Sequence, residues 1–188
     1  DAGGTTRGSG PGSSPTTNAT SDLEVTPIAL GPTAGAVYAS REKPVCDVAA
    51  ISTALQRDDD ARAAWAELMG VSPDDVAATL SKLTPLVLTR DTAVTNSRYA
   101  KGQPSTFPAI LQAGTPVLVD EAGMPRVKCS CGNPLAPAKI ERGVDLEGAR
   151  WEGFDPGAVV SVTRGVVPDG GVATIDLATG EPTTVTLD

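Results

Sequence analysis

The sequence contains no histidine. Histidine is the usual general base of hydrolases and a common ligand of catalytic zinc, so its absence excludes Ser-His-Asp and Cys-His catalysis and nearly every catalytic zinc site. Aromatic residues are almost as scarce, at 3% of 188 residues, while 40% of the residues are hydrophobic. Alanine and valine supply much of the apolar content, so we expect a core of small aliphatic side chains.

Long apolar runs and a surplus of positive charge are also missing. The sequence has no run of about 18 apolar residues, so it predicts no membrane-spanning segment. It has 15 lysines and arginines against 23 aspartates and glutamates, which gives a net charge of −8. A protein that binds the nucleic-acid backbone needs a positively charged surface, so we expect no nucleic-acid partner.

A polar N-terminal stretch precedes the predicted domain. Residues 1–22 are rich in glycine, serine, threonine and proline and hold too few apolar side chains to offset the entropy of ordering. We therefore expect a flexible tether over 1–22 and one domain over 23–188. A chain that begins at Asp1 with such a tether is typical of a protein processed after export. We expect it to be extracytoplasmic, either secreted or held to the membrane by a lipid anchor preceding Asp1.

Three consecutive helices are predicted in the first half of the domain. Spaced apolar residues and alanines predict a helix over residues 46–57. The aspartates that follow suit the first turn of a second helix, over residues 61–69, with Gly70 as its C-cap. The sequence Ser72-Pro73-Asp74-Asp75 is typical of a helix start and predicts a third helix that ends at Leu83.

A sheet is predicted in the second half of the domain. Residues 115–120 and 126–131 flank the turn 121–123 and predict a β-hairpin. Further strands are predicted at residues 86–88, 93–95, 159–163, 172–177 and 183–187. We therefore expect an α+β fold, with three short N-terminal helices followed by a mainly antiparallel sheet.

An extended segment is predicted at residues 23–38, before the helices. Its apolar residues alternate with polar residues and with Pro27 and Pro32, which favours an edge strand or irregular structure. Two arrangements remain open: the segment packs on its own sheet, or it adds a strand to another protein and makes the domain an adaptor.

Three cysteines, Cys46, Cys129 and Cys131, leave one thiol over after one disulfide bridge forms. Cys129 and Cys131 lie two apart on a predicted strand and face the same side, so either one can meet Cys46 at the start of the first helix. We expect a helix-to-sheet bridge from Cys46 to Cys131, or to Cys129. A redox pair or a metal site at Cys129 and Cys131 is the alternative. We expect no metal, because zinc needs four ligands and histidine is absent.

The most polar stretch inside the domain is residues 89–103. It places polar and aromatic side chains between apolar runs, which is typical of a surface loop that contacts a ligand or a partner. The alternative is a solvated connection that satisfies its own backbone. The aspartates at 58–60 and 74–75 stand at predicted helix starts, where capping explains them without catalysis. The candidate residues for the ligand or partner site are Arg90, Asn96, Arg98, Tyr99 and Lys101.

The segment CSCGNPL at residues 129–135 carries a resemblance to a known family. Together with other short segments, it resembles an uncharacterised domain family of actinobacterial exported lipoproteins, some of which are appended to transmembrane signalling proteins. The supporting segments are DT at 91–92, VTN at 94–96, LQAGT at 111–115, VLVD at 117–120, PRV at 125–127 and GFDP at 153–156. The resemblance runs from residue 23 to the C-terminus and implies an extracytoplasmic, membrane-tethered location without a known reaction. The family pattern often has a histidine after the asparagine, where this chain has Ser97.

The sequence favours a function without catalysis. It offers no histidine, no nucleophile motif and no calcium loop, so we expect an extracytoplasmic domain that binds a protein or an envelope component. Such a domain serves as an accessory subunit of a larger assembly and needs no cofactor. The alternative is a thiol–disulfide redox protein, or another enzyme that uses the Cys129/Cys131 pair.

Overall fold

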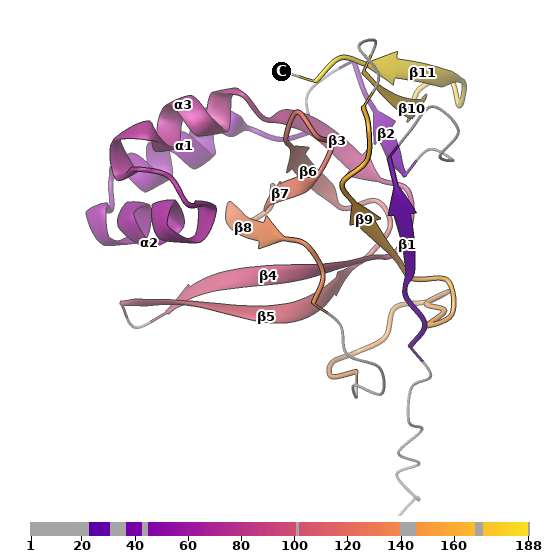
Figure 1. The fold of residues 1–188 in the computed structure, drawn as a ribbon, viewed down its shortest axis with the longest axis horizontal. Coiled ribbons are helices and arrows are strands. Elements are labelled where there is room, and N and C mark those ends of the chain that lie inside the picture. Colours follow the sequence, from indigo (N-terminus) through magenta and orange to yellow (C-terminus); the bar gives the residue numbers. More distant parts are fainter. Residues whose placement is uncertain are drawn as a thin grey trace, which may run out of the picture.

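A curled, strand-rich sheet carries a layer of helices against one side (Figure 1). The computed structural model describes residues 23–30, 37–42, 45–100, 102–139, 146–167 and 171–187. The helices are α1 (Val48–Gln56), α2 (Asp59–Met69) and α3 (Val76–Ser81), and the 3-10 turn η1 (Pro73–Asp75) leads into α3. The strands are β1 (Thr26–Ala29), β2 (Tyr38–Ser40), β3 (Thr84–Leu88), β4 (Thr92–Ala100), β5 (Gln103–Leu111), β6 (Pro116–Val119), β7 (Pro125–Lys128), β8 (Asn133–Ala136), β9 (Val160–Thr163), β10 (Val172–Asp176) and β11 (Pro182–Val185).

Capping residues set where the helices begin and end. The carboxylate of Asp47 accepts a hydrogen bond from Ala50 N at 2.8 Å, and that of Asp58 accepts one from Ala61 N at 2.9 Å. Both contacts satisfy N–H groups that the first turn of a helix leaves free. Gly70 ends α2 in the left-handed conformation, with φ +71°. The three predicted helices are confirmed, although the third begins as a 3-10 turn.

The sheet mixes parallel and antiparallel strands. Strand order along it is β1-β9-β4-β8-β7-β6-β3-β2-β10-β11, and β5 pairs with β4. β1 runs parallel to β9, β2 parallel to β10, and β4 parallel to β9, whereas the other pairs are antiparallel. The expectation of a mainly antiparallel sheet is therefore only partly right. β1 and β2 fall in the extended segment predicted before the helices, and the remaining strands follow α3, so the helices precede most of the sheet but not all of it.

The extended segment before the helices packs on its own sheet. β1 pairs with β9 through four consecutive residues, and Leu30 beside it is 4% exposed. Residues 31–36 lie outside the described part of the chain, and β2 follows them. Of the two arrangements that the sequence left open, the described residues show pairing within the chain.

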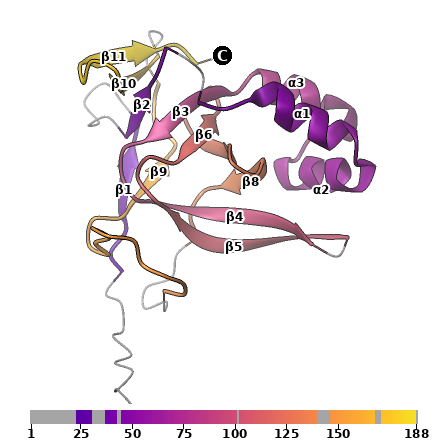
Figure 2. The same cartoon turned by 180° about the vertical axis from the view of Figure 1, so that it is seen from behind.

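Two clusters of buried side chains hold the layers together. One lies inside the curl of the sheet and includes Tyr38, Leu86 and Val117. The other lies between the helices and the outer face of β6 and β7, and it includes Trp65 and Leu118. Neighbouring residues 117 and 118 of β6 enter different clusters, because side chains alternate between the two faces of a strand. Figure 2 shows from behind that the helices cover only one part of the sheet.

The largest side chain buried inside the curl is Tyr38, whose exposed fraction is 0%. Its hydroxyl donates a 2.6 Å hydrogen bond to the carbonyl oxygen of Gly123 in the turn between β6 and β7. Burial, followed by the negative charge of Asp120, raises the pKa of this hydroxyl above its ordinary value. Tyr38 therefore stays neutral and remains a hydrogen-bond donor at neutral pH, which ties β2 to the β6–β7 turn.

Candidate functional site

A disulfide bridge joins Cys46, just before α1, to Cys129, just after β7. The two Cα atoms lie 5.3 Å apart. Cys131, the partner placed first in the sequence prediction, is not bridged; its thiol is free and exposed. The prediction assumed that the strand runs through residue 131. β7 instead ends at Lys128, and a tight turn follows, in which Gly132 N donates to Lys128 O at 2.9 Å.

Thiol labelling tests this assignment directly. We expect the native protein to take up one maleimide label without reduction, because only the Cys131 thiol is free and exposed. After reduction and unfolding it should take up three labels. The Cys131→Ser variant is the matched control and should take up none in the native state. Two or more labels on the unreduced native protein would contradict the bridge, and mass spectrometry counts them.

Most of the polar stretch predicted as a surface loop forms β4, an inner strand that pairs with β5, β8 and β9. Its first six residues are buried. Ser97 Oγ donates to Pro134 O at 2.7 Å, and Thr95 Oγ1 donates to Pro137 O at 2.8 Å. Asn96 is 8% exposed, and its side-chain oxygen accepts from Ser97 N at 2.8 Å. These polar groups therefore serve the packing of β4 against β8, and the loop prediction is wrong for this part.

The other candidate residues of that stretch are spread along the strand. Arg90 is exposed before β4 begins. Arg98 is exposed near the far end, where its Nε donates to Ser105 Oγ at 3.2 Å and its guanidinium lies 5.7 Å from the centre of the Phe107 ring. Lys101 lies outside the described residues. The structure therefore brings none of the described candidates together into one site.

Tyr99 lies across from α2. Its side chain is 39% exposed. Desolvation raises the pKa of its hydroxyl above the ordinary value, and the nearby charges of Asp60 and Asp58 add to this effect. The shift keeps the hydroxyl neutral, and it places Tyr99 beside the acidic start of α2.

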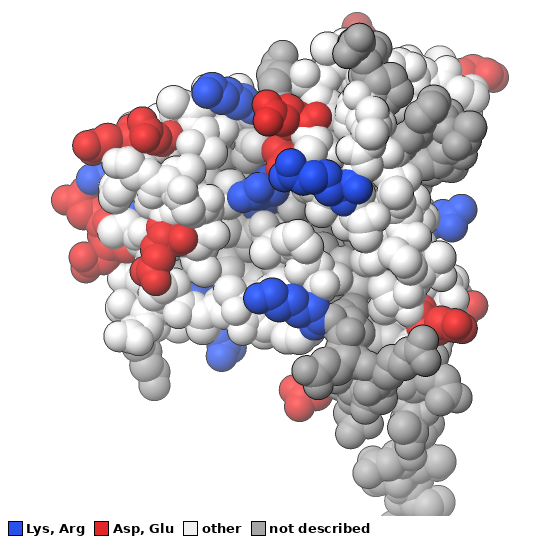
Figure 3. Space-filling model, in the orientation of Figure 1, with Lys and Arg blue, Asp and Glu red and all other residues white. Residues whose placement is uncertain are grey.

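Acidic side chains gather over the helices, as Figure 3 shows. The prediction that the aspartates cap helix starts is confirmed for Asp58, and Ser72 Oγ accepts from Asp74 N at 3.3 Å at the start of η1. Asp59 also forms an ion pair with Arg62 at 2.8 Å.

Across the described ranges, no group of three metal-ligating side chains comes together. None of the helices described is both long and apolar enough to cross a membrane.

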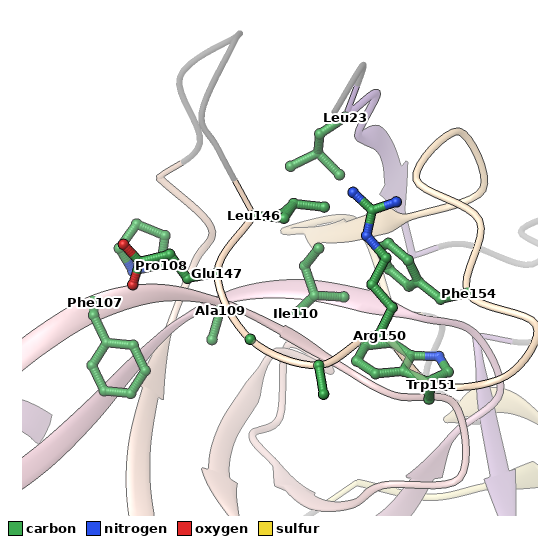
Figure 4. A pocket seen from close by; sticks show the side chains of 12 residues that line it. Leu23, Phe107, Pro108, Ala109, Ile110, Leu146, Glu147, Arg150, Trp151 and Phe154 are labelled. Carbon is green, nitrogen blue, oxygen red and sulfur yellow. The ribbon is translucent and has the colours of Figure 1, made fainter. Parts of the chain in front are cut away.

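The described surface holds a groove beside β5, with a volume of about 560 Å³ (Figure 4). One wall is formed by residues 107–110 of β5. The other is the segment 146–151, and Leu23 and Phe154 complete the lining. Most of the lining is apolar, while Glu147 and Arg150 supply the charged side chains. A volume of this size and an apolar lining are typical of ligand sites.

Trp151 is the best-anchored side chain of this groove. Its indole Nε1 donates to Asp91 Oδ2 at 3.2 Å, and the other carboxylate oxygen of Asp91 accepts from Ala113 N at 2.8 Å. Its ring meets the Phe154 ring edge-on, with centres 4.8 Å apart. Asp91 thus connects Trp151 to the start of β4 and to the residues that follow β5, which lie at the same end of this antiparallel pair, so the aromatic wall is held in place before any ligand arrives.

Half of the aromatic side chains of the protein lie at this groove. The chain has two tryptophans, two tyrosines and two phenylalanines. Trp151, Phe107 and Phe154 all line the groove. No sequence motif marked them, although their scarcity was a signal: in a chain with so few aromatic residues, a tryptophan and a phenylalanine that lie three residues apart outside any predicted element indicate a candidate site.

The fold and the groove define a strand-rich α+β domain with a ligand-sized hollow at one edge of its sheet. The chain belongs to the family described as a domain of unknown function, DUF6777, whose match covers residues 29–186. This confirms that the resemblance to an uncharacterised domain family was correct. No curated protein and no solved structure matches the chain at a significant level.

Proposed function

We propose that this chain is a non-enzymatic, extracytoplasmic binding domain whose groove beside β5 binds a segment of a protein partner in the cell envelope. The observation that carries the proposal is the concentration of aromatic side chains on a solvent-open groove of an aromatic-poor chain. Aromatic anchors that stand in a pocket supply a large share of binding energy at protein interfaces. The bond from Trp151 to Asp91 supports the proposal, since a wall fixed in advance lowers the entropic cost of binding.

The proposed location rests on the disulfide and on the sequence resemblance. Disulfide bridges persist in oxidising compartments outside the cytosol, and Cys46–Cys129 is such a bridge. The resemblance to actinobacterial exported lipoproteins supports the same compartment and an N-terminal lipid anchor preceding Asp1. On this proposal the groove faces the envelope, where the domain acts as an accessory subunit of a larger assembly.

The second candidate is a thiol–disulfide redox function, because the exposed Cys131 thiol stands two residues from bridged Cys129. In such an exchange, the Cys131 thiolate attacks Cys129 Sγ, a Cys129–Cys131 bond forms, and Cys46 leaves as a thiolate. The test measures how fast an added dithiol reduces a disulfide substrate in the presence of the protein. A fast rate with the parent and a slow rate with Cys131→Ser would favour this candidate. Equal and slow rates for both favour the binding domain.

A truncation of Trp151 tests the proposed groove. The probe is a blocked hexapeptide selected from a random displayed library on the immobilised parent protein, and fluorescence anisotropy of the labelled peptide measures its Kd. We expect Trp151→Ala to weaken binding at least about tenfold, the usual loss for an aromatic anchor. Tyr99→Ala is the matched control, since it removes an aromatic ring that lies outside the groove lining. The groove is refuted if Trp151→Ala binds as the parent does, or if both variants lose affinity equally.

A further inference from the structure

The groove lies along the free backbone edge of β5. Four consecutive residues of this strand, 107–110, line the groove. Consecutive side chains of a strand point to opposite faces, so a hollow that meets all four runs beside the strand's edge. Among the described strands, β5 pairs only with β4. Its outer edge therefore presents backbone groups to the groove.

Two prolines show which backbone groups face outward. Pro104 and Pro108 are paired with Tyr99 and Thr95 of β4. Proline has no N–H to donate, so it is tolerated in a strand where that position faces away from the neighbour. The outward positions are then the even-numbered residues of β5. On this outer edge, Ile110 in the groove lining and Thr106 next to the lining each direct both an N–H and a C=O outward, whereas Pro108 directs only its C=O.

The same prolines limit indiscriminate pairing. Edge strands invite other chains to add to the sheet, and proline is a common means of preventing this. The other two sheet edges, β1 and β11, contain Pro27 and Pro182. Among the edge strands that the structure describes, β5 alone combines remaining donors with an aromatic wall opposite, so it is the edge suited to one selected partner.

Opposite charges mark the two ends of the groove. In Figure 4, Glu147 lies beside Pro108, while Arg150 lies near Leu23 and Phe154. The lining between them is apolar. An occupant that complements the Glu147 end of the groove has an apolar part for the middle and a basic group toward Glu147.

Building on the proposed binding function, we propose that the groove takes an extended peptide segment of a partner protein as an added strand on the outer edge of β5. Backbone bonds to Thr106, Pro108 and Ile110 hold the segment, and its apolar side chains pack against Trp151 and Phe154. Its basic residue meets Glu147. The four wall residues of β5 span roughly 10 Å at about 3.4 Å per residue, so a segment of about four to six residues matches the groove.

A backbone scan of the selected hexapeptide tests the added strand. Each peptide N–H is replaced in turn by N–CH3, which removes one donor and leaves the side chain. Since alternate residues of an added strand bond to the sheet, we expect a loss of about three- to tenfold or more at alternate positions and little change between them. The strand proposal is overturned if the losses of affinity do not alternate along the peptide, or if no N-methylated peptide loses affinity.

Proline replacements give a matched pair on the protein side. Pro108→Thr restores an outward N–H inside the groove, and we expect it to tighten binding about threefold or more. Pro104→Thr restores the same group beyond the groove lining and should leave the Kd unchanged. Unchanged binding by both variants, with Trp151 still required, overturns the added strand and leaves the binding function standing. A library selection that enriches no hexapeptide contradicts the binding function itself.

Charge reversal tests the stated polarity of the ligand. Glu147→Lys should weaken the selected peptide several-fold, and exchanging the basic residue of the peptide for glutamate should restore the affinity. If neither change alters the Kd, the assignment of the basic residue to Glu147 is overturned.

Discussion

Replacing Cys46 with serine is expected to lower the free energy of unfolding by about 4–5 kcal/mol, because the bridge to Cys129 closes a sequence separation of 83 residues and so restricts the unfolded chain. For a domain of this size, that loss corresponds to a fall in Tm of roughly 10–20 °C. Strain and residual structure in the unfolded chain reduce the figure. Thermal and guanidinium unfolding, followed by circular dichroism, measure both quantities.

The third cysteine provides the control for this experiment. Cys131→Ser exchanges an exposed, unbridged side chain and should change the free energy of unfolding by less than about 0.5 kcal/mol. Cys129→Ser should match Cys46→Ser, and the double variant should be no less stable than either single one, since one bridge is lost in each case. The assignment fails if Cys46→Ser melts within a degree or two of the parent, or if Cys131→Ser is the destabilised variant.

The helices were predictable because their signals are local. Asp58 and Gly70 bound α2 by contacts within a few residues of themselves, and the pattern of small and apolar residues between them already marks the buried face. Nothing distant is needed to place such a helix. The same holds for the hairpin of β6 and β7, whose turn is closed by Asp120 accepting from Ala122 N and Met124 N.

The β4–β5 pair was not predictable in this way, because its strands depend on distant partners. The hydroxyls of Thr95 and Ser97 in β4 are buried because backbone carbonyls near β8, about 40 residues away, accept their hydrogen bonds. β5 was missed altogether, since Pro104 and Pro108 argue against a strand unless one knows that it lies at an edge. Local pattern carries no information on edge position, and tertiary pairing decided both strands.

The groove also escaped sequence analysis, for a related reason. Its walls come from residues near 23, 107–110 and 146–154, which no single motif spans. Asp91 and Phe154 do lie in segments that carried the family resemblance, but their contacts with Trp151 depend on the fold.

One partner of the disulfide was predicted from the sequence and the other was left open. The spacing indicated Cys46 as one partner, and only the turn at 128–132 decides between the other two cysteines.

Gly171→Ala is expected to destabilise the protein by about 3–5 kcal/mol, from two separate causes. The φ angle of Gly171 is +101°, a conformation that residues with a Cβ rarely adopt. A Cβ at this position would also overlap the carbonyl oxygen of Val185. Val185 is paired with Val172 in the β10–β11 ladder, so its backbone cannot withdraw without breaking that pairing.

Gly148 separates the two causes, because its φ is also +101° but a Cβ there meets nothing within 4 Å. Gly148→Ala should therefore show only the conformational cost, about 1–2 kcal/mol, and the difference between the two variants measures the overlap with β11. Urea unfolding gives both free energies, and hydrogen exchange at the amides of β10 and β11 shows whether the loss is confined to that ladder. Equal destabilisation by the two substitutions would mean that the β10–β11 backbone moves aside freely. The close approach of Gly171 to Val185 would then contribute nothing to the loss of stability.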